Sequence, residues 1–160
     1  MVKMILCIDS NGSIGKDNDL LFKMKEDMKF FKQQTMGNIV IMGYNTWLSL
    51  GEKPLPNRAN IVMTDKKIKN IQTSTDLVSV IKDYEKYPQD IFIIGGAYVY
   101  DLALELGLVD EILITIVPVE VQGADKKINL ELTKEFNKRS IIETFVNEGG
   151  IKVTIEKWKK

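Results

Sequence analysis

The sequence predicts a single α/β domain: a central, mostly parallel eight-stranded sheet with an antiparallel C-terminal hairpin, flanked by about four helices. Two observations support this class. Apolar runs of strand length alternate with amphipathic helical segments through most of the chain, as in sheets whose crossovers are helices. The last two apolar runs are separated only by the turn residues 147–150, which indicate a hairpin. A chain of 160 residues is one ordinary domain, 1–160.

The composition excludes several classes of function. Lys plus Arg and Asp plus Glu both number 22, so no basic field favours nucleic acid. Histidine is absent, which excludes Ser-His and Cys-His nucleophiles and histidine zinc sites. The single cysteine, Cys7, forms no internal disulfide and is expected to be a small core residue. With no signal-peptide pattern and no membrane-spanning stretch, we expect a cytoplasmic monomer without metal or membrane partners.

The elements follow from the apolar pattern in chain order. Residues 2–8 are a buried strand interrupted only by Lys3, and a turn-rich loop follows at 9–19. A helix begins near Met24. The later expected elements are a strand at 37–43, a short helix at 44–50 capped by Asn45 or Thr46, a strand at 60–63, a helix at 76–84, a strand at 90–94, a helix at 97–106, a strand at 111–119 and hairpin strands at 140–146 and 151–158.

The first helix carries a carboxylate on its apolar face. Met24, Met28 and Phe31 have the spacing of one buried stripe, and Asp27 falls beside them. An unpaired buried carboxylate costs several kcal/mol, so Asp27 needs a partner. That partner is either an Arg, a Lys or backbone donors elsewhere in the fold, or a ligand with a planar, two-donor cationic edge.

Two strands end in glycine immediately before a helix. Gly43 precedes the helix at 44–50, and Gly95-Gly96 precedes the helix that starts at Ala97. Such turns bind anions in α/β sheets, although tight packing of strand and helix is the alternative explanation here. The G-x-G-x-x-G fingerprint of dinucleotide folds is absent. Thr115 is the one hydroxyl in its strand, a position that β-branched residues often merely fill.

These segments together resemble dihydrofolate reductase over essentially the whole chain. The resemblance implies reduction of 7,8-dihydrofolate to tetrahydrofolate by NADPH, with hydride transfer to pterin C6 and protonation of N5 through a water molecule. It also implies binding of antifolates such as methotrexate or trimethoprim. The segments that carry it are residues 14–15, 25–32, 41–47, 54–58 and 94–100, with Thr115.

The resemblance also implies roles for single residues on the substrate side. Asp27 receives the 2-amino group and N3 of the pterin, and Thr115 supports that carboxylate. Arg58 clamps the α-carboxylate of the glutamate tail, a bidentate role that lysine fills poorly. The other implied substrate residues are Ile5, Leu6, Met28, Phe31, Lys32, Leu50, Lys53, Leu55 and Ile94.

On the cofactor side, the resemblance places the pyrophosphate at Gly95 and Gly96, with a hydroxyl from Thr46. The segment from residue 15 to residue 24 is the implied closing loop. Leu20, Phe22 and Tyr100 complete the catalytic set with Asp27, and Tyr100 lies beside the nicotinamide. The other implied cofactor residues are Cys7, Ile14, Gly15, Asn18, Leu20, Gly43, Tyr44, Asn45, Thr64, Asp65, Lys66, Ile94, Ala97, Tyr98 and Val99.

The sequence departs from the family pattern at a few positions. Leu21-Phe22 stands where Pro-Trp is usual, and Ala124 replaces an aspartate, with Asp125 adjacent. Tyr44 and Asp65 occupy positions where the family commonly contacts the cofactor phosphate. The sequence therefore does not exclude NADH as the cofactor in place of NADPH. Two other readings compete: a riboflavin-pathway pyrimidine reductase, which would lack Asp27 and Arg58, and a non-catalytic nucleotide-binding module.

Overall fold

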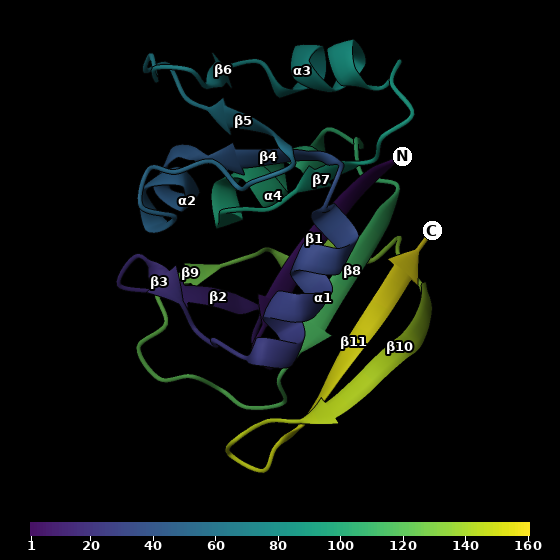
Figure 1. Cartoon of the computed structure of the whole chain (residues 1–160). Coiled ribbons are helices and arrows are strands. Elements are labelled where there is room, and N and C mark those ends of the chain that lie inside the picture. Colours follow the sequence, from purple (N-terminus) through teal and green to yellow (C-terminus); the bar gives the residue numbers. More distant parts are fainter.

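The computed structural model describes residues 1–160 and contains one large sheet, with strand order β10-β11-β8-β1-β7-β4-β5-β6 (Figure 1). The strands from β8 to β6 in this order are all parallel. Strand β11 runs antiparallel to β8, and β10 pairs antiparallel with β11, so β11 is the one strand that runs against the rest of the sheet. The predicted mostly parallel, eight-stranded sheet with a C-terminal hairpin is confirmed. The strands are β1 (Val2–Ile8), β4 (Ile39–Gly43), β5 (Ala59–Met63), β6 (Gln72–Ser74), β7 (Ile91–Ile93), β8 (Glu111–Ile116), β10 (Lys138–Val146) and β11 (Lys152–Lys159).

Helices cover both faces of this sheet, as Figure 1 shows for α1 in front and α4 behind. On one face, Phe30 of α1 packs in a cluster with Val40 and Leu113 of the sheet. On the other face, side chains of α3 and α4 join a core of 21 buried residues. The helices are α1 (Lys25–Thr35), α2 (Tyr44–Ser49), α3 (Leu77–Tyr84) and α4 (Ala97–Glu105), with a 3₁₀ turn η1 (Leu130–Thr133). No helix combines the length and apolar character needed to cross a bilayer.

A second, three-stranded sheet lies where the sequence suggested only a loop. It has the order β3-β2-β9, from β2 (Ser13–Lys16), β3 (Asp19–Leu20) and β9 (Lys126–Lys127). The interpretation of residues 9–19 as a turn-rich loop was therefore incomplete. These strands are two to four residues long and mostly polar, so they lack the apolar run that marks a buried strand.

The buried side of α1 differs from the predicted stripe. Met28 is 61% exposed, whereas Phe30 is 7% exposed and Thr35 is fully buried. The buried face is thus centred on Asp27 and Phe30 rather than on Met28. Met24 precedes the helix as its N-cap residue, so its burial says little about which side of the helix faces the sheet.

Other boundaries also shifted. The N-cap of α2 is Gly43 with no side-chain cap, so the prediction of Asn45 or Thr46 was wrong. The strand expected from residue 37 begins at Ile39, because Gly37 has a left-handed φ of +77°. The strand expected to reach residue 119 ends at Ile116, since the N–H of Val119 turns back to the carbonyl of Val117.

Candidate active site

The carboxylate of Asp27 lies in the first turn of α1 and faces β8. The hydroxyl of Thr115 donates a hydrogen bond of 2.5 Å to Asp27 Oδ1. Asp27 takes part in none of the ion pairs of the protein. Burial raises the pKa of Asp27, and the Thr115 hydrogen bond opposes that shift only in part. The site therefore holds a half-buried carboxylate without a cation to balance it.

The floor of this site is built from β1 and the start of α4. Tyr100 is 4% exposed and donates from its hydroxyl to the carbonyl of Ile5 at 2.8 Å. Cys7 is half-buried, and burial followed by the charge of Asp27 raises the pKa of its thiol. Cys7 thus packs against the small core cluster of Met24, Val117 and Val153, as a protonated thiol that senses the charge of Asp27. Leu6 is buried and Ile94 is half-buried.

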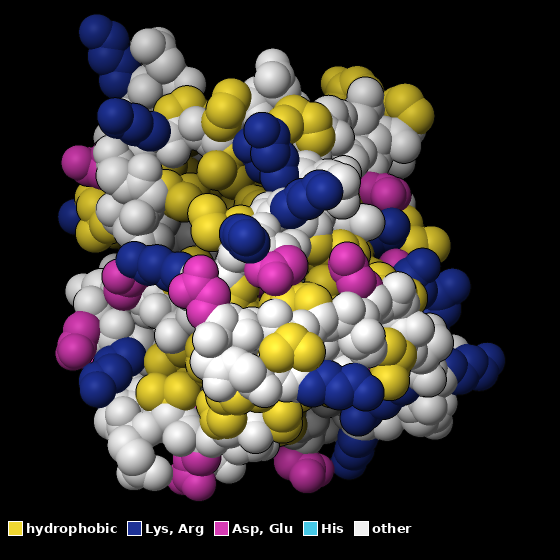
Figure 2. Space-filling model, turned by 60° about the horizontal axis from the view of Figure 1, so that its bottom comes forward, with side chains coloured by type: hydrophobic (Ala, Val, Ile, Leu, Met, Phe, Trp, Pro, Cys, Tyr) yellow, Lys and Arg dark blue, Asp and Glu magenta, His cyan; other side chains and the backbone are white.

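An apolar wall extends from Asp27 along α1 and α2. Half-buried Phe31, Leu50 and Leu55 pack against the cluster that contains Phe30 and Trp47. Figure 2 shows a hollow lined by hydrophobic side chains, with Lys or Arg side chains at its rim. A partly exposed apolar surface next to a carboxylate suits a ligand with a flat ring system and one polar edge.

Arg58 stands at the far end of this wall with its guanidinium fixed. Its Nε donates to the carbonyl of Pro56 and its Nη1 to the hydroxyl of Thr35, both at 2.9 Å. Burial lowers the pKa of Arg58. Lys53 precedes Arg58 by five residues and Lys32 precedes Thr35 by three; both lysines are exposed and make no ion pair.

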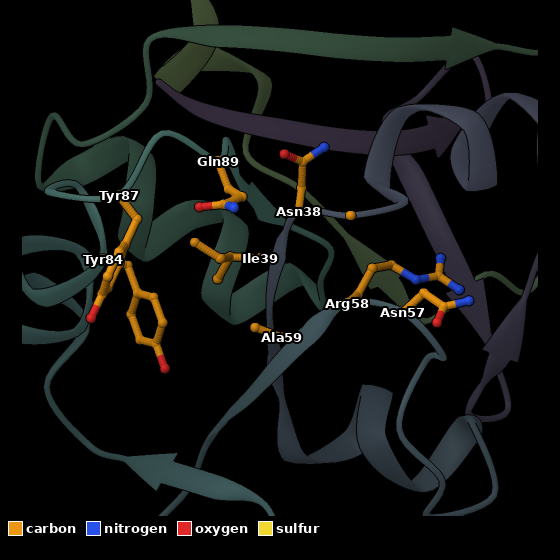
Figure 3. A pocket seen from close by; sticks show the side chains of 9 residues that line it. Asn38, Ile39, Asn57, Arg58, Ala59, Tyr84, Tyr87 and Gln89 are labelled. Atoms are coloured by element: carbon orange, nitrogen blue, oxygen red, sulfur yellow. The ribbon is translucent and has the colours of Figure 1, made fainter.

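A cavity of about 480 Å³ also touches Arg58, but on another side. It lies where β4 and β5 begin and is bordered by Tyr84 and Tyr87 (Figure 3). In Figure 3 the guanidinium of Arg58 points away from both tyrosines. This cavity does not include Asp27 or its neighbours.

The glycine turns form a cradle at the ends of β4 and β7. A Cβ built on Gly95 would come within 3.3 Å of the Tyr100 hydroxyl and 3.4 Å of Thr46 Oγ1, and one on Gly43 within 3.0 Å of Val99. The peptide bond between Gly95 and Gly96 is cis. No side chain caps the N-terminus of α4, so its first N–H groups are available to an anion. Ala97 is half-buried and Tyr98 is 77% exposed.

The edge beside this cradle carries the residues expected near a cofactor phosphate. Lys66 Nζ lies 5.1 Å from the ring centroid of Tyr44, a cation–π distance. The hydroxyl of Thr64 accepts from the N–H of Lys66 at 3.2 Å. Asn45 and Asp65 are exposed. A lysine thus lies over the ring of Tyr44, one of the two residues that depart from the family pattern at the cofactor phosphate.

The small sheet forms the loop side of the site. Its β2 holds half-buried Ile14 and buried Gly15, and Asn18 takes a left-handed φ of +61° in the turn to β3. Leu20 is 65% exposed. Phe22 is half-buried and packs with Met24, Val117 and Val153. The position held by tryptophan in the family therefore carries a ring without an N–H.

The profile of the dihydrofolate reductase family matches residues 1–159. The chain belongs to the dihydrofolate reductase family. A bifunctional dihydrofolate reductase-thymidylate synthase of Paramecium tetraurelia is 33% identical over 92% of this chain, which spans about a third (32%) of that longer protein. A dihydrofolate reductase of Ureaplasma parvum is 32% identical over 91% of this chain and 94% of its own length.

A solved structure agrees with these relatives. The dihydrofolate reductase of Enterococcus faecalis, complexed with NADP(H) and RAB-propyl, superposes with a TM-score of 0.81 at 25% identity, covering 99% of this chain and 95% of that one.

Two residues that support this candidate site, Asp9 and Thr35, were missed from the sequence, and Asp125 was noted there only as the neighbour of Ala124. Asp9 is fully buried and accepts the N–H groups of Asn11 and Ser13 at 2.9 Å and of Val121 at 3.0 Å. Asp125 accepts the N–H of Asp17 at 3.1 Å, and Thr35 supports Arg58. An aspartate two residues before Asn and four before Ser is a turn signal; the contacts to Val121 and Asp17 are long-range and left no local signal.

Proposed function

We propose that this protein reduces 7,8-dihydrofolate to 5,6,7,8-tetrahydrofolate with NADPH. The observation that carries the proposal is the Asp27–Thr115 pair: a half-buried carboxylate with a raised pKa and no cation partner, beside an apolar wall. Membership of the dihydrofolate reductase family supports it. So does the Enterococcus faecalis relative, which was solved with NADP(H).

The geometry of Asp27 fits a two-donor edge. Thr115 occupies Oδ1, and no hydrogen bond from the protein reaches Oδ2. A carboxylate oxygen has two lone pairs, so the 2-amino group and N3 of a pterin can bind both oxygens at once. Methotrexate and trimethoprim carry a similar edge, and we expect both to compete with dihydrofolate for Asp27.

Asp27 orients and polarises the pterin rather than giving it a proton directly. NADPH, when bound, supplies the hydride that reaches C6. N5 lies away from the carboxylate in the proposed orientation, so a water molecule brings its proton. Phe22 offers no N–H to order that water, which leaves the closing loop from Gly15 to Met24 to exclude bulk solvent.

The glycine cradle fits the pyrophosphate of the cofactor. Gly95 and Gly96 bring backbone close without a Cβ, Thr46 adds a hydroxyl, and α4 presents uncapped N–H groups. Gly43 leaves the same approach open from β4. These features fit NADPH and NADH equally. The residues that distinguish the two cofactors are therefore expected at the edge that carries Tyr44 and Lys66.

Lys66 is the residue that we expect to favour NADPH. Its ammonium stands over Tyr44, where it can pair with a 2′-phosphate that NADH lacks. We predict that Lys66→Ala raises the KM for NADPH about tenfold and leaves the KM for NADH within twofold. Lys67→Ala, an equally exposed neighbour, is the matched control and should change neither value. Equal changes for both cofactors in Lys66→Ala would contradict the assignment.

The direct test is the fall in absorbance of NADPH when dihydrofolate is added, with methotrexate as inhibitor. Turnover that methotrexate stops supports the proposal. Binding of NADPH without turnover would indicate a non-catalytic module, and turnover only with a ribosylated pyrimidine would indicate the riboflavin-type reaction. Cytoplasmic location and a monomeric state stay predictions, which fractionation and sedimentation can test.

A further inference from the structure

Thr35, the last residue of α1, makes two hydrogen bonds of defined direction. Its side chain is fully buried, donates to the carbonyl of Phe31 at 2.8 Å and accepts from Arg58 Nη1 at 2.9 Å. A hydroxyl has a single proton. Because that proton is given to Phe31, the oxygen of Thr35 faces Arg58 only as an acceptor.

The guanidinium of Arg58 is held at two points and left free along one edge. Of its five N–H donors, Nε is used by Pro56 and one Nη1 hydrogen by Thr35. Both Nη2 hydrogens and the second Nη1 hydrogen remain free to donate to a ligand. Arg58 takes part in none of the ion pairs of the protein, so its charge has no anionic partner within the chain.

We propose that Thr35 is a positioning residue, which fixes the plane of Arg58 so that its free Nη edge meets the carboxylate of the glutamate tail. The inference rests on the proposed function, because that tail is part of dihydrofolate. The bond from Nε to Pro56 alone fixes one point of a long, flexible side chain, and the bond to Thr35 fixes a second. Bidentate recognition of a carboxylate requires that fixed plane.

The direction of Arg58 agrees with this role. Figure 3 shows its guanidinium turned away from Tyr84 and Tyr87, and the contact with Thr35 places it at the end of α1 that also carries Phe31. The guanidinium is therefore at the α1 side of Arg58 and points away from the tyrosines of the cavity.

The test compares two substrates that differ only in the tail. Dihydropteroate has the pterin and benzoyl groups of dihydrofolate but no glutamate. We expect Thr35→Val, which keeps the shape and removes the acceptor, to raise the KM for dihydrofolate about tenfold. The KM for dihydropteroate and both kcat values should stay within twofold. Thr35→Ser should keep the KM for dihydrofolate at the parent value. The double variant Thr35→Val, Arg58→Leu should have the same KM for dihydrofolate as Arg58→Leu alone.

Each contrary result has a distinct meaning. If Arg58→Leu selectively raises the KM for dihydrofolate and Thr35→Val does not, the role of Thr35 is overturned and the proposed function stays intact. If Thr35→Val raises the KM for both substrates equally, the role of Thr35 is merely structural. Absence of turnover in the unaltered protein would refute the proposed function, while quenching of tryptophan fluorescence by dihydrofolate would still compare the Thr35 variants. If Thr35→Val does not fold, Thr35→Cys, a weak acceptor, replaces it.

Discussion

At the scale of single residues, the site retains a group that the fold would be more stable without. Asp27 is half-buried, its pKa is raised by burial, and Thr115 supplies its one hydrogen bond. A group whose pKa is raised in the folded state binds protons more strongly there than in the unfolded chain. Its contribution to stability is therefore full below the ordinary aspartate pKa and is lost as pH rises through the raised value.

We predict that Asp27→Asn is more stable than the parent protein at pH 7, by about 1 kcal/mol. The amide removes the desolvated charge, and the gain should shrink as pH falls through the raised pKa of Asp27 and be gone below the ordinary aspartate pKa. The same variant should keep NADPH binding and lose most turnover at neutral pH. Thermal melts across pH, with kcat/KM measured on the same samples, test both parts. Parental turnover across the pH range would show that Asp27 does not perform the proposed role.

At the scale of elements, the small sheet joins two segments that are distant in sequence. Ser13 and Gly15 of β2 pair with β9, and Asp9 ties the start of β2 to Val121 through its carboxylate. Burial acts to raise the pKa of Asp9, but its backbone hydrogen bonds prevail and lower it. Asp9 therefore stabilises the fold above the ordinary aspartate pKa, and that contribution is lost as pH falls through the lowered value.

We predict that Asp9→Ala lowers the free energy of unfolding by about 3 kcal/mol, because three N–H groups lose their acceptor. Since Gly15 shifts with β2, kcat should fall more than the KM for dihydrofolate rises. Asp76→Ala is a matched control: Asp76 caps α3 by accepting the N–H of Ser79, far from β2 in sequence. It should lower stability by about 1 kcal/mol and leave kcat unchanged. Urea melts measure the stability of the two variants, and steady-state kinetics measure their kcat. Equal effects of Asp9→Ala and Asp76→Ala on kcat would contradict the assignment of β2 to the closing loop.

The elements that the sequence predicted well are those with long apolar runs. Strands β1, β4, β7 and β8 are buried on both faces, so their residues are almost all apolar and easily recognised. The small sheet was missed because β2, β3 and β9 are stabilised by contacts between distant segments and not by a local pattern. The buried face of α1 was misjudged because an apolar residue was taken to be a buried one: Met28 is 61% exposed.

The site residues divide in the same way. Asp27 was recognisable because a carboxylate on an apolar helix face breaks the pattern. Thr115 drew little notice from its sequence alone, since a threonine in a strand is ordinary. Thr35 gave no signal in the sequence and Asp9 gave only a turn signal, because their distinguishing partners are 23 residues away in one case and 112 residues away in the other.

At the scale of the whole molecule, the sheet brings together residues that lie far apart in the chain. Thr115 on β8, Ile5 and Cys7 on β1 and Gly95 after β7 become neighbours because these three strands are adjacent and parallel. Carboxyl ends of parallel strands meet at one edge, where ligands bind in open α/β sheets. A ligand at this edge contacts several elements at once and should stabilise the entire fold.

We predict that NADPH at 100 times its Kd raises the melting temperature by roughly 5–10 °C, the equivalent of about 2.7 kcal/mol. Gly95→Ala should abolish that rise, since its Cβ would crowd Tyr100 and Thr46. Gly107→Ala is the control: Gly107 also has a positive φ, of +68°, but open space around it. It should lower the melting temperature of the free protein and keep the NADPH shift. Loss of the shift in both variants would argue against a cofactor cradle at Gly95.

Because the chain has no histidine, the protonation of Asp27 can be followed in a pH titration without overlapping imidazole signals. Most enzymes titrate several imidazoles between pH 5 and 8, and their signals overlap with those of a catalytic acid. Here burial moves the Cys7 thiol and the Tyr100 phenol upward, away from that interval, while Asp27 moves toward it. A carboxyl stretching band recorded by infrared difference spectroscopy during a pH titration, with and without substrate, should report Asp27 once the same titration of Asp27→Asn is subtracted to remove the other Asp and Glu side chains. In this molecule, the protonation of one side chain can be followed directly.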